Sequence, residues 1–93
     1  MTELARITTL EGLALALLDR RKSLGLSQVR VDDISGLQSG YTGKIEAEAK
    51  NPGRGKGLGR TSLPLLLGAL ECELVLMPVR RPDSRDVAKR HVV

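Results

Sequence analysis

The 93-residue chain carries 15 Lys and Arg against 11 Asp and Glu, a net charge of +4 that favours a polyanionic partner. Cys72 is the only cysteine, which excludes an intrachain disulfide and leads us to expect a reducing, cytoplasmic compartment. His91 is the only histidine, which excludes a multi-histidine metal site, so we expect no cofactor and no enzyme activity.

The first predicted element is a helix that begins at Leu10 or Glu11 after a threonine cap. Its apolar residues are spaced by threes and fours, which is typical of one buried helical face. These residues are Leu10, Leu13, Ala14, Leu17 and Leu18. The basic cluster 20–22 then either complements the helix dipole in solvent or contacts phosphate. The apolar run is too short to cross a bilayer, so no membrane association is expected.

A second, short helix is predicted over residues 27–35. Ser27 can cap it, because a serine hydroxyl accepts a hydrogen bond from the free N–H groups of a first turn. Val31 and Ile34 are expected to face the core, and Gly36 lies where the helix must end and the chain must reverse.

A third helix is predicted over residues 38–48. It begins at Gln38 or Ser39, after Leu37, which is expected to pack in the turn between the two helices. Ile45 is expected to lie in the core. Two short helices joined by a glycine turn form a helix-turn-helix, whose second helix enters the major groove of DNA. The pair therefore predicts DNA binding.

A family pattern matches this segment without a gap. The matching residues are Ser27, Gln28, Val31, Gly36, Leu37, Gln38, Ile45 and Glu46. They resemble the helix-turn-helix of the Cro/CI-type (lambda-repressor-like, XRE) DNA-binding family, and the similarity extends over 18–26 and 63–70. The resemblance implies a mainly α, lambda-repressor-like domain of four to five helices over residues 1–79, with its helix-turn-helix at about 27–48.

Two positions depart from the family pattern. Asp32 replaces the small residue that packs between the helices, so it needs a partner, which Arg30, Lys44 or a backbone N–H could supply. Thr42 replaces an apolar residue and either faces inward or contacts DNA. These departures leave room for a member of the family that binds protein instead of DNA.

The resemblance implies DNA contacts from the predicted helix-turn-helix. The candidates are Gln28, Gln38, Ser39, Tyr41, Thr42 and Lys44. Glutamine can pair with adenine, lysine can reach guanine, and serine or threonine can serve either base. The alternative is a polar helix start without a ligand for the glutamines, and partial burial for Tyr41. Glu46 resembles the family's structural glutamate, which ties the helix end to neighbouring groups rather than to DNA.

A basic, glycine-rich loop is predicted over residues 50–60. Its alternating glycines and one proline argue against regular structure, so we expect it to be flexible. Arg54, Lys56 and Arg60 are candidates for phosphate contacts, the alternative being a solvated connector. No Gly-x-x-x-x-Gly-Lys-Ser/Thr string occurs, so a nucleotide-binding P-loop is not expected.

The last predicted helix runs from a cap at Thr61 or Ser62 to Leu70. It is apolar nearly all round, so it must be buried. Cys72 is expected to be a small buried residue near its end. The basic residues of 80–93, with few apolar anchors, predict a flexible tail.

Residues 73–79 predict one β-strand, because a short apolar run with a β-branched residue ends at Pro78. A lone strand cannot satisfy its own backbone groups, so we expect it to pair with the same strand of a second subunit. The dimerisation residues would be Leu74, Val75, Leu76 and Met77. The alternative is that this segment extends the last helix.

These features together predict a sequence-specific transcriptional regulator, a repressor that binds double-stranded DNA as a homodimer on an inverted-repeat operator. The first alternative is a protein-binding antiactivator or antitoxin-like module that retains the helix-turn-helix fold. A second alternative is an architectural nucleic-acid binder without sequence preference, which the basic loop and tail favour.

Overall fold

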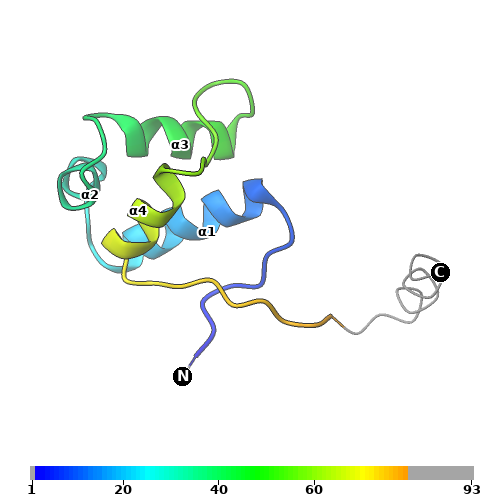
Figure 1. Cartoon of the computed structure of the whole chain (residues 1–93). Helices are drawn as coiled ribbons and strands as arrows, with labels where there is room; N and C mark the ends of the chain where they lie inside the picture. The colour runs from blue at the N-terminus through cyan, green and yellow to red at the C-terminus, as the bar shows by residue number, and fades with distance from the viewer. Residues whose placement is uncertain (1, 80–93) are drawn as a thin grey trace.

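Four helices make up the regular structure of residues 2–79, the part of the chain that the computed structural model describes. They are α1 (Leu10–Ser23), α2 (Gln28–Ser35), α3 (Tyr41–Lys50) and α4 (Ser62–Ala69). Helix α1 packs against α3, and α2 contacts both α3 and α4 (Figure 1). Over these residues the fold is therefore mainly helical, with no strand. None of the described helices is both long and apolar enough to span a bilayer.

Local capping explains where the first two helices begin and end, as predicted. The Thr9 hydroxyl accepts from the Gly12 N–H at 3.0 Å, and the Ser27 hydroxyl accepts from the Arg30 N–H at 3.0 Å. Helix α2 ends at Gly36, whose φ of +83° lies in the left-handed region that glycine adopts readily.

The core is aliphatic and lies between the helices. Its buried hydrophobic members are Leu13, Ala14, Leu17, Leu18, Val31, Ile45, Ala49, Leu66, Ala69 and Leu70. The inward positions expected for Leu10 and Ile34 are wrong, since their side chains are 63% and 45% exposed. Helix α2 buries Val31 and Asp32, and Ile34 lies roughly 110° around the helix from the middle of that face.

Helix α3 begins later than predicted, at Tyr41 rather than at Gln38 or Ser39. Gly40 precedes it with a φ of +87°, a left-handed conformation that cannot continue a right-handed helix backwards. Gln38 and Ser39 therefore lie in the turn between α2 and α3, both exposed.

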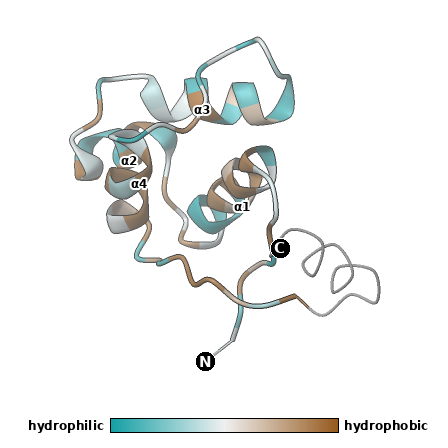
Figure 2. Cartoon of the chain, turned by 45° about the vertical axis from the view of Figure 1, so that its right-hand side comes forward, coloured by the Kyte–Doolittle hydropathy of each residue, from teal (hydrophilic) through white to brown (hydrophobic). Residues whose placement is uncertain are grey.

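The strand expected over residues 73–79 is absent from the described chain, as is the alternative extension of α4. The helix ends where the N–H groups of Glu71 and Cys72 return to the carbonyls of Gly68 and Leu67, and Glu71 has a φ of +52°. The segment then runs irregularly away from the helices and crosses the N-terminal segment (Figure 2), because residues 2–79 offer it no neighbouring strand. The predicted tail, 80–93, lies outside the described residues.

Candidate nucleic-acid interface

One buried carboxylate, that of Asp32, holds the turn of the helix-turn-helix. One oxygen accepts from the Thr42 N–H at 2.9 Å and the Thr42 hydroxyl at 2.6 Å, and the other accepts from the Gly40 N–H at 2.8 Å. The N-cap residue of α3, Gly40, has no side chain, so Asp32 supplies the capping acceptor from the neighbouring helix. Of the three partners expected for Asp32 (Arg30, Lys44 or a backbone N–H), the backbone N–H is therefore the correct one.

Thr42 is only 3% exposed and faces Asp32. The prediction that Thr42 contacts DNA is therefore wrong, and the inward alternative is confirmed. Asp32 and Thr42, the two departures from the pattern that this segment resembles, bind each other. Thr42 supplies a hydroxyl donor in place of an apolar group, and Asp32 supplies the carboxylate acceptor in place of a small residue. That both substitutions fall at the packing positions of adjacent helices was the signal for this pairing in the sequence.

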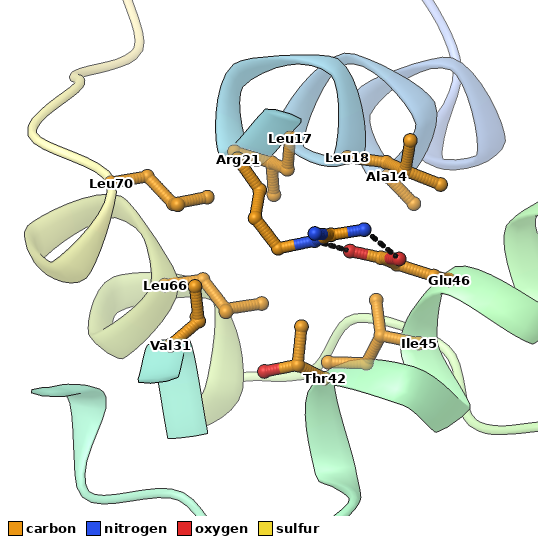
Figure 3. Close-up of a pocket in the computed structure, with 10 residues that line it drawn as sticks. All are labelled: Ala14, Leu17, Leu18, Arg21, Val31, Thr42, Ile45, Glu46, Leu66 and Leu70. Carbon is orange, nitrogen blue, oxygen red and sulfur yellow. Dashed lines mark hydrogen bonds and ion pairs between the residues drawn. The ribbon is translucent and has the colours of Figure 1, made fainter. Parts of the chain in front are cut away.

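A second buried network joins α1, α2 and α3 around Glu46 (Figure 3). The Arg21 guanidinium donates to both Glu46 oxygens, at 2.6 and 2.9 Å, and also to the carbonyl of Leu26 at 2.8 Å. The Gln28 amide donates to Glu46 at 2.7 Å. The structural role predicted for Glu46 is confirmed, whereas Arg21 is neither solvated nor free for phosphate, since its side chain is 12% exposed.

The pKa of Glu46 is lowered by this network. Burial alone would raise the pKa, but the hydrogen bonds from Arg21 and Gln28 and the positive charges of Arg21 and Lys50 together outweigh burial. Glu46 therefore remains ionised at neutral pH, and the hydrogen bond that Arg21 donates to Glu46 in turn raises the pKa of Arg21.

Acid is expected to weaken the fold through Glu46. A carboxyl whose pKa is lowered by folding stabilises the folded state fully at pH values above its unfolded pKa, which is about 4.3 for glutamate. This contribution is lost as the pH falls through the pKa of the folded state. The free energy of unfolding measured by urea titration should therefore decline below about pH 5, where unfolded glutamate begins to take up protons. The decline should be shallower in Glu46→Gln, and an equal decline in both proteins would contradict this prediction.

Gln28 connects α2 to α3 as well as to Glu46. A Cβ added to Gly43 would lie only 3.1 Å from the amide oxygen of Gln28. The glutamine side chain therefore crosses α3 at this glycine, which leaves room for it. The residue remains exposed at the surface. Gln28 thus has a brace role within the helix pair, and any contact with phosphate would be additional to it.

The exposed side of the helix-turn-helix presents the remaining predicted contacts. Gln38 and Ser39 are exposed in the turn, Lys44 is exposed on α3, and Tyr41 is half-buried at the first position of α3. The structure gathers these four residues around the start of α3. Among the first seven residues of α3, Tyr41 and Lys44 have the long polar side chains that are not fully buried, although Tyr41 also packs against the core.

The basic loop is irregular, as predicted, but it is fixed on α3 rather than free. The Glu48 carboxylate accepts from the N–H groups of Gly53 and Gly55, and the Lys56 N–H donates to the Lys44 carbonyl at 3.1 Å. The Lys56 ammonium lies 5.7 Å from the centroid of the Tyr41 ring, within cation–π distance. Glu48 was not among the predicted site residues, because no distinctive spacing marks it in the sequence.

The candidate cations of the loop differ in position. Arg54 and Lys56 are exposed within the part of the loop that rests on α3, and Arg60 is exposed just before the N-cap of α4. The structure thus brings Lys56 together with Tyr41 and Lys44, and Arg54 is placed between two glycines bound to Glu48.

The predicted dimerisation residues lie apart from this surface. Leu74, Val75, Leu76 and Met77 are 54%, 68%, 99% and 57% exposed. Among residues 2–79, no group of three His, Cys, Asp or Glu side chains could hold a metal ion. Comparison of the chain with protein-family models, with curated proteins and with solved structures gives no match.

Proposed function

We propose that the chain is a cytoplasmic, sequence-specific DNA-binding regulator with a lambda-repressor-like fold. The observation that carries the proposal is the α2–turn–α3 unit, in which Asp32 fixes the turn and leaves Gln38, Ser39 and Lys44 exposed at the start of α3. A helix presented in this way fits the major groove of B-DNA. The regulator would act by occluding a promoter, as a repressor.

The exposed side chains match the chemistry of base edges. Gln38 can form a bidentate pair with adenine, Lys44 can donate to the acceptors of guanine, and Ser39 can serve either base. Gly40, which has open space on its Cβ side, lets the start of α3 approach the bases closely, and the loop beside α3 adds positive charge for the phosphates.

Base selectivity is expected to depend on Gln38 and Lys44. Replacing both with alanine should remove about 1–3 kcal/mol of discrimination for each lost bidentate contact. The measurement is fluorescence anisotropy on a duplex from upstream of the gene and on a scrambled duplex, at about 50 and 200 mM salt. Arg6→Ala is the control, because Arg6 belongs to the exposed N-terminal segment 2–9. This segment runs on the side of α1 away from α3 (Figure 1). Unchanged selectivity in the double variant would refute this assignment of base contacts.

The proposed regulator is a homodimer that binds an inverted repeat. Leu74, Val75, Leu76, Met77 and Val79 form an exposed apolar segment whose backbone groups have no strand partner in the described chain. A second copy offers an identical segment around a two-fold axis, so antiparallel pairing would cover both.

Val75→Asp is expected to abolish this dimer, because it would place two carboxylates in one apolar interface. Analytical ultracentrifugation should show at least about tenfold weaker self-association, which corresponds to 1.4 kcal/mol. Val29→Asp is the matched control, since Val29 on α2 is 72% exposed and Val75 is 68% exposed. Equal association of the two variants would place the dimer interface elsewhere.

The second candidate function is a protein-binding, antitoxin-like module. The same exposed apolar segment favours it, because patches of this kind mark protein contact sites. Absence of binding to every duplex by a folded wild-type protein would favour this module over the regulator. Salt-sensitive binding without selectivity would instead favour an architectural nucleic-acid binder.

A further inference from the structure

The basic loop is attached to α3 along one stripe of the helix, formed by Tyr41, Lys44 and Glu48. These positions are three and four residues apart and lie on the same helical face. The attachments are the three N–H contacts to Glu48, at 2.9 to 3.1 Å, the Lys56 N–H on the Lys44 carbonyl and the Lys56 ammonium over Tyr41. The loop therefore arches over α3 before it reaches α4 (Figures 1 and 2).

Gly55 sets the distance between the loop and the helix. A Cβ at this position would lie 2.0 Å from the Lys44 carbonyl oxygen and 3.0 Å from the Glu48 nitrogen. Both obstacles are backbone atoms of α3, so a side chain would have to displace the loop. Gly57, two residues later, has open space around its Cβ position and no left-handed φ, so alanine fits there.

The position of Glu48, half-buried beside the loop, is unexpected for a DNA-contacting face, because a carboxylate there repels phosphate. Here the carboxylate accepts from Gly53 and Gly55, the two neighbours of Arg54. The negative charge thereby orders the segment that carries Arg54 and Lys56. A binding segment that is ordered in advance loses less conformational entropy when it meets its ligand.

We propose that Glu48 and Gly55 are positioning residues that fix the loop on α3, so that Arg54 and Lys56 meet the phosphates flanking the groove that α3 enters. This inference rests on the proposed function. It assigns the loop to affinity and salt dependence, whereas Gln38 and Lys44 provide selectivity. The loop acts on every duplex alike, because phosphates carry no base identity.

Glu48→Ala separates a positioning role from a simple electrostatic one, because the two predict opposite signs. Removing a carboxylate from a phosphate-facing surface should strengthen binding if the charge only repels. A positioning role predicts weaker binding to the upstream and scrambled duplexes by the same factor, about fivefold or more, with a salt slope smaller by about one for each lost phosphate contact. Tighter binding by Glu48→Ala would overturn the proposal.

Gly55→Ala should reproduce this effect, and Gly57→Ala is its matched control. In the free protein, Gly55→Ala should lose exchange protection at the Lys56 amide and change the fluorescence of Tyr41, the only aromatic residue, while the helical circular dichroism is retained. Equal affinities and salt slopes for the two alanine variants would overturn the proposal. If wild-type protein binds no duplex, the proposed function fails and this role of the loop with it. If the wild-type protein binds the upstream duplex selectively, but Glu48→Ala and Gly55→Ala keep the wild-type affinity and salt slope, this inference fails and the proposed function stands.

Discussion

Replacing Glu46 with alanine is expected to lower the free energy of unfolding by about 3–5 kcal/mol, the usual cost of removing one partner of a buried ion pair. The variant would leave the Arg21 guanidinium, 12% exposed, with one carbonyl partner in place of a carboxylate, and the Gln28 amide without its acceptor. Small domains have a total stability of about 5–15 kcal/mol, so much of the protein could unfold at 37 °C.

Urea unfolding followed by circular dichroism at 222 nm measures this cost. Glu3→Ala is the matched control, since Glu3 pairs with Arg6 in an ion pair whose side chains are 59% and 74% exposed. Loss of such a pair typically costs less than about 1 kcal/mol. The double variant Arg21→Met/Glu46→Leu should be more stable than Glu46→Ala, because it leaves no unpaired buried charge. A cost for Glu46→Ala no larger than that for Glu3→Ala would contradict the assigned role.

Asp32→Ala is expected to cost about 2–4 kcal/mol, because it leaves buried donors without an acceptor. The N–H groups of Gly40 and Thr42 and the Thr42 hydroxyl all bind this carboxylate. Because these bonds also fix the start of α3, we expect the amides of Gly40 and Thr42 to lose protection from hydrogen exchange.

The adjacent Asp33 gives a matched control for this variant. Its side chain is 71% exposed and pairs with Arg30 on the surface, so Asp33→Ala should change stability by less than about 0.5 kcal/mol. A double-mutant cycle with Thr42→Val isolates the hydroxyl–carboxylate bond, and the double variant should cost less than the sum of the single ones. Equal stabilities of Asp32→Ala and Asp33→Ala would contradict the capping role.

The predictions that held depended on residues close together in the chain. Ser27 caps the helix that immediately follows it, and Gly36 ends that helix in a left-handed conformation. Such effects act within one turn, so a local pattern is sufficient to locate them. Ile45 and Val31 were placed in the core by helical spacing alone.

Helical spacing also placed Leu10 and Ile34 in the core, where they do not lie, and three further predictions failed because they depended on partners from other parts of the fold. Asp32 caps α3 from eight residues before Gly40, which sets the beginning of α3 at Tyr41 rather than in the preceding turn. Arg21 was expected at the end of its helix either in solvent or on phosphate, yet it pairs with a carboxylate 25 residues away. The loop was expected to be flexible because it is rich in glycine, but its backbone N–H groups bind the carboxylate of Glu48. No local pattern records these long-range pairs.

Arg20 joins the end of α1 to the end of α4. Its guanidinium donates to the carbonyls of Leu70 and Glu71, at 2.9 and 3.2 Å, just before the chain leaves the helices toward Leu74. In the proposed dimer, this exit direction determines how far apart the two copies of α3 lie. In that dimer, the number of base pairs between the half-sites of the operator would then depend on the link that Arg20 makes between α1 and α4.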